Sequence, residues 1–187
     1  TKLFTATLVM QLVDEGRIDL GAPIRAYLPD YAGEGRDVTV RQLLNHTSGI
    51  ANFDTVTDAA TALRDGIPAY QLPHTSDDLL RRHASGKQVH APGTTFDYNN
   101  GDYVILGKLI ERVTGMPFEQ TLSRRILEPL KLDDTGMLRQ GEILPRLART
   151  YFVREDTGKL VNDLPVYPEN WYAAGGMYST VRDLRVF

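Results

Sequence analysis

The sequence contains no cysteine, and this absence removes several kinds of chemistry at once. Disulfide bonds, thiolate metal sites and cysteine nucleophiles are all excluded. A chain without cysteine suits an oxidising or a reducing compartment equally well. The absence therefore limits the chemistry of the protein but does not indicate where it works.

An excess of either charge is also missing. Lysine and arginine number 21, aspartate and glutamate number 24, and the net charge is -3. This balance leaves no basic footprint for nucleic acid or for an anionic membrane surface. No apolar run reaches the roughly 20 residues that a transmembrane helix needs, so no transmembrane segment is expected in this sequence.

What the sequence does contain is enough apolar material for a core. Hydrophobic residues make up 42% of the 187 residues, which excludes wholesale disorder. A chain of this length fits one domain or part of a larger one. No internal repeat or low-complexity tract is present.

Helical patterns dominate the chain. Residues 1–16 start in full helical periodicity, carried by Leu3, Ala6, Met10 and Val13, and Gly16 provides a stop. Helical spacing and end signals predict further helices around residues 24–28, 40–46, 77–85, 102–114 and 117–130, and one that opens after Ser179 or Thr180. Because the first helix has no cap and the last one has only begun, we expect a piece truncated at both ends.

One segment changes period. Residues 149–163 read as two short strands around the turn residues Asp156, Thr157 and Gly158, which predicts a β-hairpin. Residues 51–74 lack clear periodicity and are expected to form a long loop with fragments of structure. The predicted fold class is therefore α+β, mostly helical with a small β element.

The stretch LLNHTSGI, residues 43–50, places His46 and Ser48 two positions apart. Such neighbours do not share a helical face, and the G-x-S-x-G presentation of a nucleophilic serine is absent. We therefore favour a helix end over a catalytic dyad. On this interpretation His46 donates to free carbonyls in the last turn, Thr47 and Ser48 satisfy local backbone groups, and Gly49 is left-handed.

The other histidines are His74, His83 and His90. None of them forms a tight ligand pair with another, and Gly86 separates His83 from His90. We therefore expect no metal site and no cofactor.

The stretch FDYNNGDY permits two interpretations. Asn100-Gly101 is a good hairpin turn, and it is also a good helix start with Asn100 as the cap and Asp102 in the first turn. The helical pattern that continues to Val113 favours the helix. Tyr98 then lies in a loop just ahead of a helix N-terminus, a common place for functional side chains, although a structural role is about as well supported.

Taken in order, several stretches resemble the serine β-lactamase-like family, which includes class C β-lactamases, low-molecular-weight penicillin-binding proteins and related esterases. The matching stretches are TKLFTATLVMQLVDEGRIDLGAPIRAYLP, VTVRQLLNHTSGI, PGTTFDYNNGDYVILGKLIERVTG, LEPLKLDDTGM and AAGGMYSTVRDL. They cover most of the chain except residues 51–74. Each motif is weak or moderate alone, and the ordered series is specific.

The resemblance gives the first two residues a meaning. Members of this family carry S-x-x-K at the head of the helix, and here Thr1-Lys2 match its end. The nucleophilic serine is then expected two positions before Thr1. A serine and a lysine three residues apart share a helical face, so the amine can reach the hydroxyl, and the helix N-terminus favours negative charge nearby.

Tyr98-Asn99-Asn100 matches the family motif Y-x-N. The resemblance implies that Tyr98 shuttles protons together with Lys2, and that Asn100 hydrogen-bonds Lys2 and the carbonyl side of the substrate. A neighbouring lysine cation lowers the pKa of a tyrosine, which makes it a better base. The implied cycle passes through an acyl-enzyme.

Two departures from the family pattern matter. The third motif, K-T-G or H-x-G on an edge strand, does not occur up to Phe187, and the strand amide of the oxyanion hole is missing with it. Gly175 and Gly176 lie in a stretch that precedes this motif in the family, and we expect them to mark a close backbone approach near the pocket. The 187-residue piece alone is expected to be inactive.

The expected fold is the helical region of a single β-lactamase/transpeptidase-like domain, with residues 1–187 as one part of it. The expected function is a serine hydrolase that forms an acyl-enzyme with a small-molecule or peptide-like ester, amide or β-lactam. The alternative is a non-catalytic homologue that binds peptidoglycan-like ligands or protein partners. The residue two positions before Thr1 distinguishes the two, because a serine there supports an enzyme.

Overall fold

The computed structural model describes residues 1–53, 61, 66, 68–82, 84–154, 156–163 and 165–187. Its longer helices are α1 (Lys2–Asp14), α6 (Ser76–Arg82) and α7 (Asn100–Thr114). The shorter ones are α2 (Ile24–Tyr27), α3 (Val40–Leu44), α5 (Pro68–Gln71), α8 (Phe118–Leu122), α9 (Glu128–Leu130) and α10 (Val181–Val186). Two 3-10 segments, η1 (Glu34–Asp37) and η3 (Pro168–Ala174), and the π-helical turn η2 (Ser123–Leu127) complete the helical part.

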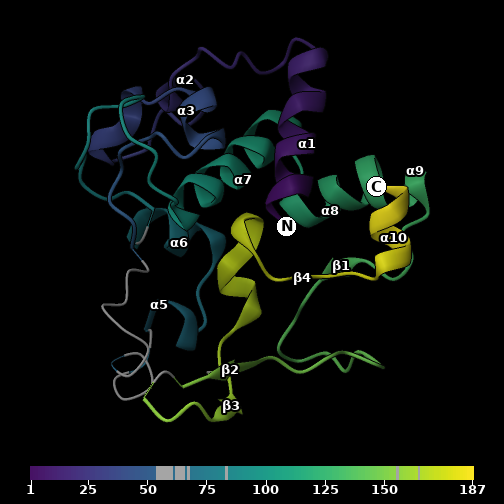
Figure 1. The fold of residues 1–187 in the computed structure, drawn as a ribbon. Coiled ribbons are helices and arrows are strands. Elements are labelled where there is room, and N and C mark those ends of the chain that lie inside the picture. Colours follow the sequence, from purple (N-terminus) through teal and green to yellow (C-terminus); the bar gives the residue numbers. More distant parts are fainter. Residues whose placement is uncertain (54–60, 62–65, 67, 83, 155, 164) are drawn as a thin grey trace.

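Helix α7 is the central element of the fold. It packs against α1, α3, α6, α8 and η3, and its residues 101–107 are all buried (Figure 1). The expected helix is therefore present, and it ends as predicted at Gly115, whose φ is 71°. Because α7 touches most of the other helices, the groups at its N-terminal end are held by the core.

Helix α1 crosses α7 with a different face from the one that the sequence pattern suggested. Phe4, Leu8 and Leu12 are buried against the core, whereas Leu3 is 71% and Met10 is 42% exposed. The helix itself was predicted correctly. Its hydrophobic residues surround much of the axis, so spacing alone did not identify the buried side.

The helix caps follow ordinary sequence signals with one exception. Thr39 caps α3, where its hydroxyl accepts from the Gln42 N–H and the Gln42 side chain accepts from the Thr39 N–H. At α7 the cap is Asn99, whose side-chain oxygen accepts from the Gly101 N–H at 2.7 Å. The expected cap, Asn100, is instead the first helical residue.

The strands form two small antiparallel sheets. Strands β2 (Tyr151–Val153) and β3 (Leu160–Asn162) are the predicted hairpin, which extends below the helices in Figure 1. Strands β1 (Gly136–Met137) and β4 (Met177–Tyr178) pair across a long connection and were not predicted, because two-residue strands leave no periodic pattern. The combination of helices and small sheets makes the fold α+β.

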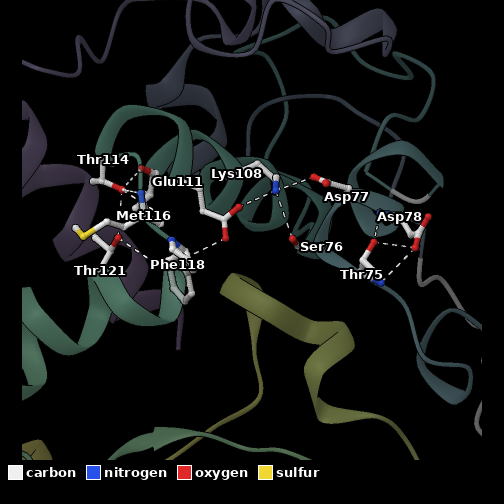
Figure 2. A network of polar contacts seen from close by, with 12 residues as sticks. Thr75, Ser76, Asp77, Asp78, Lys108, Glu111, Thr114, Met116, Phe118 and Thr121 are labelled. Carbon is white, nitrogen blue, oxygen red and sulfur yellow. Dashed lines mark hydrogen bonds and ion pairs between the residues drawn. The ribbon is translucent and has the colours of Figure 1, made fainter.

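A polar network joins α6 to α7 and α7 to α8 (Figure 2). Lys108 on α7 donates to Asp77 at 2.7 Å and to Glu111 at 2.6 Å. Glu111 in turn accepts from the Phe118 N–H at 3.0 Å. Each charge in this network therefore has an opposite charge or a backbone donor beside it.

Part of the segment 51–74, namely 54–60, 62–65 and 67, lies outside the described residues, as does His83. In the described part, the Tyr70 carbonyl accepts from the Tyr167 N–H at 2.7 Å. This bond ties the segment to the chain just ahead of η3. None of the helices described in the structure is long and apolar enough to cross a membrane.

Candidate active site

Three elements meet around the Lys2 ammonium. Its Nζ donates to the Asn100 side-chain oxygen at 2.6 Å and to the Ala174 carbonyl at 2.7 Å. Lys2 belongs to the first turn of α1, Asn100 to the first turn of α7, and Ala174 to the end of η3. The ammonium therefore has a defined position at the junction of elements that are far apart in the sequence.

Two threonines on α1 explain why its first turn sits there. The Thr5 hydroxyl donates to the Ala173 carbonyl at 2.7 Å, and the Thr1 hydroxyl accepts from the Met177 N–H at 3.2 Å. Thr5 is fully buried. These bonds fix the first turn of α1 against the 173–177 stretch and so aim Lys2 toward α7.

Lys2 also lies over two aromatic rings. Its Nζ is 4.7 Å from the centre of the Tyr98 ring and 5.4 Å from that of Tyr103. Both distances suit a cation–π contact. Tyr98 is 51% exposed, so a substrate can reach it from solvent. The structure thus brings together Lys2, Tyr98 and Asn100, the three residues that the Y-x-N and S-x-x-K resemblances singled out.

Asn100 can face Lys2 because its neighbour caps the helix. Asn99 uses its side-chain oxygen for the Gly101 N–H and its amide for the Ile50 carbonyl at 2.8 Å. The Asn100 side chain then points to Lys2, and its amide also donates to the Tyr70 hydroxyl at 3.4 Å. Of the two adjacent asparagines, Asn99 therefore caps the helix and Asn100 contacts Lys2.

The glycine pair beside this junction has a steric reason. At Gly176, where φ is 77°, a Cβ atom would lie 2.5 Å from the Pro168 carbonyl oxygen. At Gly175 a Cβ would lie 2.9 Å from the Cβ of Trp171. The expected close backbone approach is present, and it lets the preceding Ala174 carbonyl reach Lys2.

The HTSG stretch does not present a serine to solvent. Ser48 is 1% exposed, and its hydroxyl accepts from the Ile50 N–H at 3.1 Å. Gly49 is left-handed as predicted, with φ of 69°. A buried hydroxyl engaged in its own turn does not suit a nucleophile that must meet an external substrate.

The role expected for His46 needs correction. His46 lies beyond the end of α3 and has φ of 56°. Its Nδ1 accepts from the Asn99 N–H at 3.3 Å, so this atom does not donate to a helix carbonyl. The helix end itself is as expected, because the His46 N–H donates to the Leu43 carbonyl at 3.3 Å and the Thr47 N–H donates to the Gln42 carbonyl at 2.9 Å. The correction concerns the side chain, which adds a long-range contact to these local bonds.

A buried carboxyl beside His46 was missed by the sequence reading. Asp102 is fully buried, and its Oδ2 lies 3.5 Å from His46 Nδ1. Neither carboxyl oxygen has a hydrogen bond of normal geometry within the described part of the chain. Burial raises the pKa of Asp102 above its ordinary value, although contacts with His46 and Ser48 oppose the shift. In the sequence, Asp102 was singled out only as a first-turn residue that supports a helix start.

The remaining ionisable residues do not form a metal centre. Among the residues that the structure describes, no group of three or more histidines and carboxylates is placed to hold a metal ion. His90 is exposed and lies 4.0 Å from the Asp97 carboxylate. A cavity of about 210 Å³ lies between α8, β1 and η3, and its walls include Phe118, Met137 and Tyr172 but none of the site residues.

Comparison with known proteins identifies the family. The Beta-lactamase family model matches residues 1–187, so the chain belongs to that family. Penicillin-binding protein 4 of Amycolatopsis lactamdurans is 34% identical over 158 residues, which is 80% of this chain and 38% of that protein. Protein flp of Staphylococcus aureus strain MW2 is 31% identical over 139 residues, 72% of this chain and 26% of that protein.

Solved structures show the same fold. A D-stereospecific amidohydrolase from Streptomyces sp. is 33% identical with a TM-score of 0.82, and the match covers 100% of this chain and 57% of that one. The D-amino acid amidase from Ochrobactrum anthropi SV3 is 31% identical with a TM-score of 0.78, covering 100% and 53%. The expected β-lactamase/transpeptidase-like fold is confirmed, and the chain spans little more than half of these structures.

Proposed function

We propose that this Beta-lactamase family chain is part of a serine hydrolase that works through an acyl-enzyme. The observation that carries the proposal is the Lys2 ammonium, held by Asn100 and Ala174 and lying over the Tyr98 ring. Two neutral oxygens orient this amine, and no carboxylate among the described residues forms an ion pair with it. Such an amine is suited to exchanging protons with a neighbouring hydroxyl.

The proposed nucleophile is a serine two positions before Thr1, in a single domain of which residues 1–187 form one part. A residue three positions before Lys2 lies on the same helical face, within reach of its amine. The position also lies at the N-terminal end of α1, where the helix dipole favours a developing alkoxide. The groups present in the chain would then surround the nucleophile rather than supply it.

The proposed cycle conserves protons at each step. Tyr98, assisted by Lys2, takes the serine proton while the serine oxygen bonds to the substrate carbonyl carbon. The bond from that carbon to the leaving group then breaks, and Tyr98 returns the proton to the leaving nitrogen or oxygen. The water oxygen then bonds to the acyl carbon while the same pair takes a water proton. The bond between the serine oxygen and the acyl carbon breaks, and the pair returns the proton to the serine. Asn100 orients Lys2 and the carbonyl side of the substrate.

The proposed substrate is an ester, an amide or a β-lactam. Two of the similar structures are named as a D-stereospecific amidohydrolase and a D-amino acid amidase. These names favour an amide next to a D-configured residue as the first substrate to try. A panel of D- and L-amino acid amides, a chromogenic ester and a chromogenic cephalosporin would rank the three classes by kcat/KM.

The test is covalent labelling of the full-length protein with a fluorophosphonate and a penicillin, followed by peptide mapping. We expect the label two positions before Thr1 and its loss in Lys2→Ala. Lys159→Ala is the matched control, because Lys159 is exposed on the β-hairpin, and it should label normally. Label on Ser48 would contradict the site assignment. The absence of any label, with an alanine or glycine at the expected position, would instead support a non-catalytic binding homologue.

A further inference from the structure

One residue outside the proposed catalytic groups contacts three consecutive residues of the Tyr98 segment. The His46 carbonyl accepts from the Asp97 N–H at 2.9 Å. The His46 ring lies 4.6 Å, centre to centre, from the ring of Tyr98. His46 Nδ1 accepts from the Asn99 N–H at 3.3 Å. The position of His46 therefore sets the position of the Tyr98 backbone on both sides and of its ring.

His46 is itself held in an unusual conformation. Its φ of 56° is uncommon for a residue with a side chain and persists only when the surroundings impose it. The imidazole lies 5.1 Å from the Tyr103 ring and meets the Phe96 ring edge-on at 6.0 Å. Asp102 closes the buried side at 3.5 Å from Nδ1. Packing on all these sides supplies the required constraint.

The same turn makes a second contact with the stretch that follows Tyr98. The Asn99 amide donates to the Ile50 carbonyl at 2.8 Å, and the Asn99 oxygen accepts from Gly101. Residue 46 thus bonds residues 97 and 99, and residue 50 adds a second bond to Asn99. A histidine that only filled space in the core would not need bonds to the backbone on either side of one exposed tyrosine.

The hydrogen bond also defines a protonation state. Because Nδ1 accepts from the Asn99 N–H, it carries no proton in this arrangement. A proton on Nδ1 would place two N–H groups against each other and push the Asn99 backbone away. Among the described residues, the ionisable groups beside this imidazole or its three aromatic neighbours are Asp102, Asp97, Tyr98, Tyr103 and Lys2.

We propose that His46 is a positioning residue, whose neutral imidazole, backed by the buried Asp102, holds Tyr98 beneath the Lys2 ammonium. This inference rests on the proposed function, in which Tyr98 and Lys2 exchange the serine proton. His46 acts only through Tyr98 and the Asn99 backbone. The HTSG turn then closes α3 and also supports the site.

Two substitutions separate the contributions of the ring and of the acceptor. His46→Phe keeps an aromatic ring and removes Nδ1. His46→Asn removes the ring, but its side-chain oxygen occupies a place similar to that of Nδ1, and asparagine tolerates positive φ. In the full-length protein we expect His46→Phe to lower kcat about 100-fold with little change in KM, because a misplacement of about 1 Å costs that much. His46→Asn should recover part of the loss.

The control and the parallel variant keep the outcomes distinct. His90→Asn, at an exposed histidine beside Asp97, should leave kcat unchanged. If Lys2→Ala abolishes turnover while both His46 variants keep the wild-type kcat, the positioning role is wrong and the proposed function stands. If Lys2→Ala has no effect, the proposed function itself fails.

A measurement on the unaltered protein does not depend on the folding of any variant. The ¹⁵N NMR shift of His46 Nδ1 in the full-length protein distinguishes an unprotonated acceptor from an N–H donor. We expect the acceptor form at the pH of maximal activity. A protonated Nδ1 at that pH would overturn the inference, whatever the variants show.

Discussion

The charged side chains at the N-terminal end of helix α7 and those toward its C-terminal half differ in how completely they are paired. Toward its C-terminal half, Lys108 contacts Asp77 and Glu111 (Figure 2). Its Nζ lies 2.7 Å from the Asp77 carboxylate and 2.6 Å from that of Glu111. At its N-terminal end, the fully buried Asp102 carboxyl lies 3.5 Å from His46 Nδ1 and has no hydrogen bond of normal geometry in the described part of the chain, and Lys2 donates to two neutral oxygens. Charges that stabilise a fold are paired, whereas charges at a functional site are left partly uncompensated and available for chemistry.

The pKa shifts express the same difference. Burial lowers the pKa of Lys108, but its bonds to Asp77 and Glu111 outweigh that cause and raise it overall. At Asp102 burial is the largest cause, and the contacts with His46 and Ser48 do not cancel it. Complete pairing keeps Lys108 charged, and incomplete pairing favours the neutral form of Asp102.

The largest expected effect comes from removing the Lys2 ammonium beside the N-terminal end of α7. Lys2→Ala in the full-length protein should lower kcat/KM by about 1,000-fold, because it removes a proton-transfer group. The midpoint of urea unfolding should change little, since in the described part of the chain the Lys2 ammonium makes no ion pair, and it donates to two neutral oxygens. An active Lys2→Ala enzyme would show that the partly uncompensated charge of Lys2 is not needed for the reaction.

The next largest effect comes from removing Lys108 from the paired network on α7. Lys108→Met should lower the free energy of unfolding by about 2 kcal/mol, less than for a fully buried pair because the Asp77 side chain is 62% exposed. Urea denaturation measures this loss. The kcat of the folded protein should persist, and Arg81→Met, in an exposed pair with Asp78, should cost well under about 1 kcal/mol. Equal losses in both variants would show that the network adds nothing beyond a surface pair.

A smaller effect concerns the turn beneath the site. Ser48→Ala removes the acceptor of the Ile50 N–H and should cost about 1 kcal/mol of unfolding free energy. Turnover should remain, because Ser48 is not the proposed nucleophile. Complete loss of turnover in a well-folded Ser48→Ala protein would reinstate the dyad that the spacing argued against.

The smallest expected effect is on how the free energy of unfolding changes with pH. The folded-state pKa of Asp102 is raised above the ordinary value of 3.8, so the folded protein binds the proton more tightly than the unfolded chain. Stability from this group is therefore present at low pH and is lost as pH rises through the raised pKa. Asp102→Asn should flatten that fall, measured by urea unfolding from about pH 4 to about pH 7. An unchanged slope would mean that Asp102 is charged and compensated.

Adjacent residues show how far the sequence could lead. The Y-x-N match identified Tyr98 and Asn100, but the capping signal was assigned to Asn100 instead of Asn99. Either asparagine can cap a helix, and the choice depends on which one also has a partner across the fold. Asn100 meets Lys2, as the resemblance implied, whereas the contact of Asn99 with the Ile50 carbonyl is not visible along the chain.

His46 teaches a related lesson. Sequence spacing correctly separated it from Ser48, and local reasoning then placed it at a helix end. Its bonds to residues 97 and 99 arise because two segments about 50 positions apart pack together. A sequence signal for such a contact would have to come from pairs of positions, not from periodicity.

By itself the sequence determined the family, the α+β class, most helices and the hairpin, because caps, glycine stops and ordered motifs are local properties. Tertiary structure decided which face of α1 is buried and which asparagine caps α7. It also decided that β1 pairs with β4 and that His46 and Asp102 lie behind Tyr98. Those outcomes depend on how distant segments pack together. The free energy of that packing is distributed over many contacts, so no single stretch of the sequence determines it.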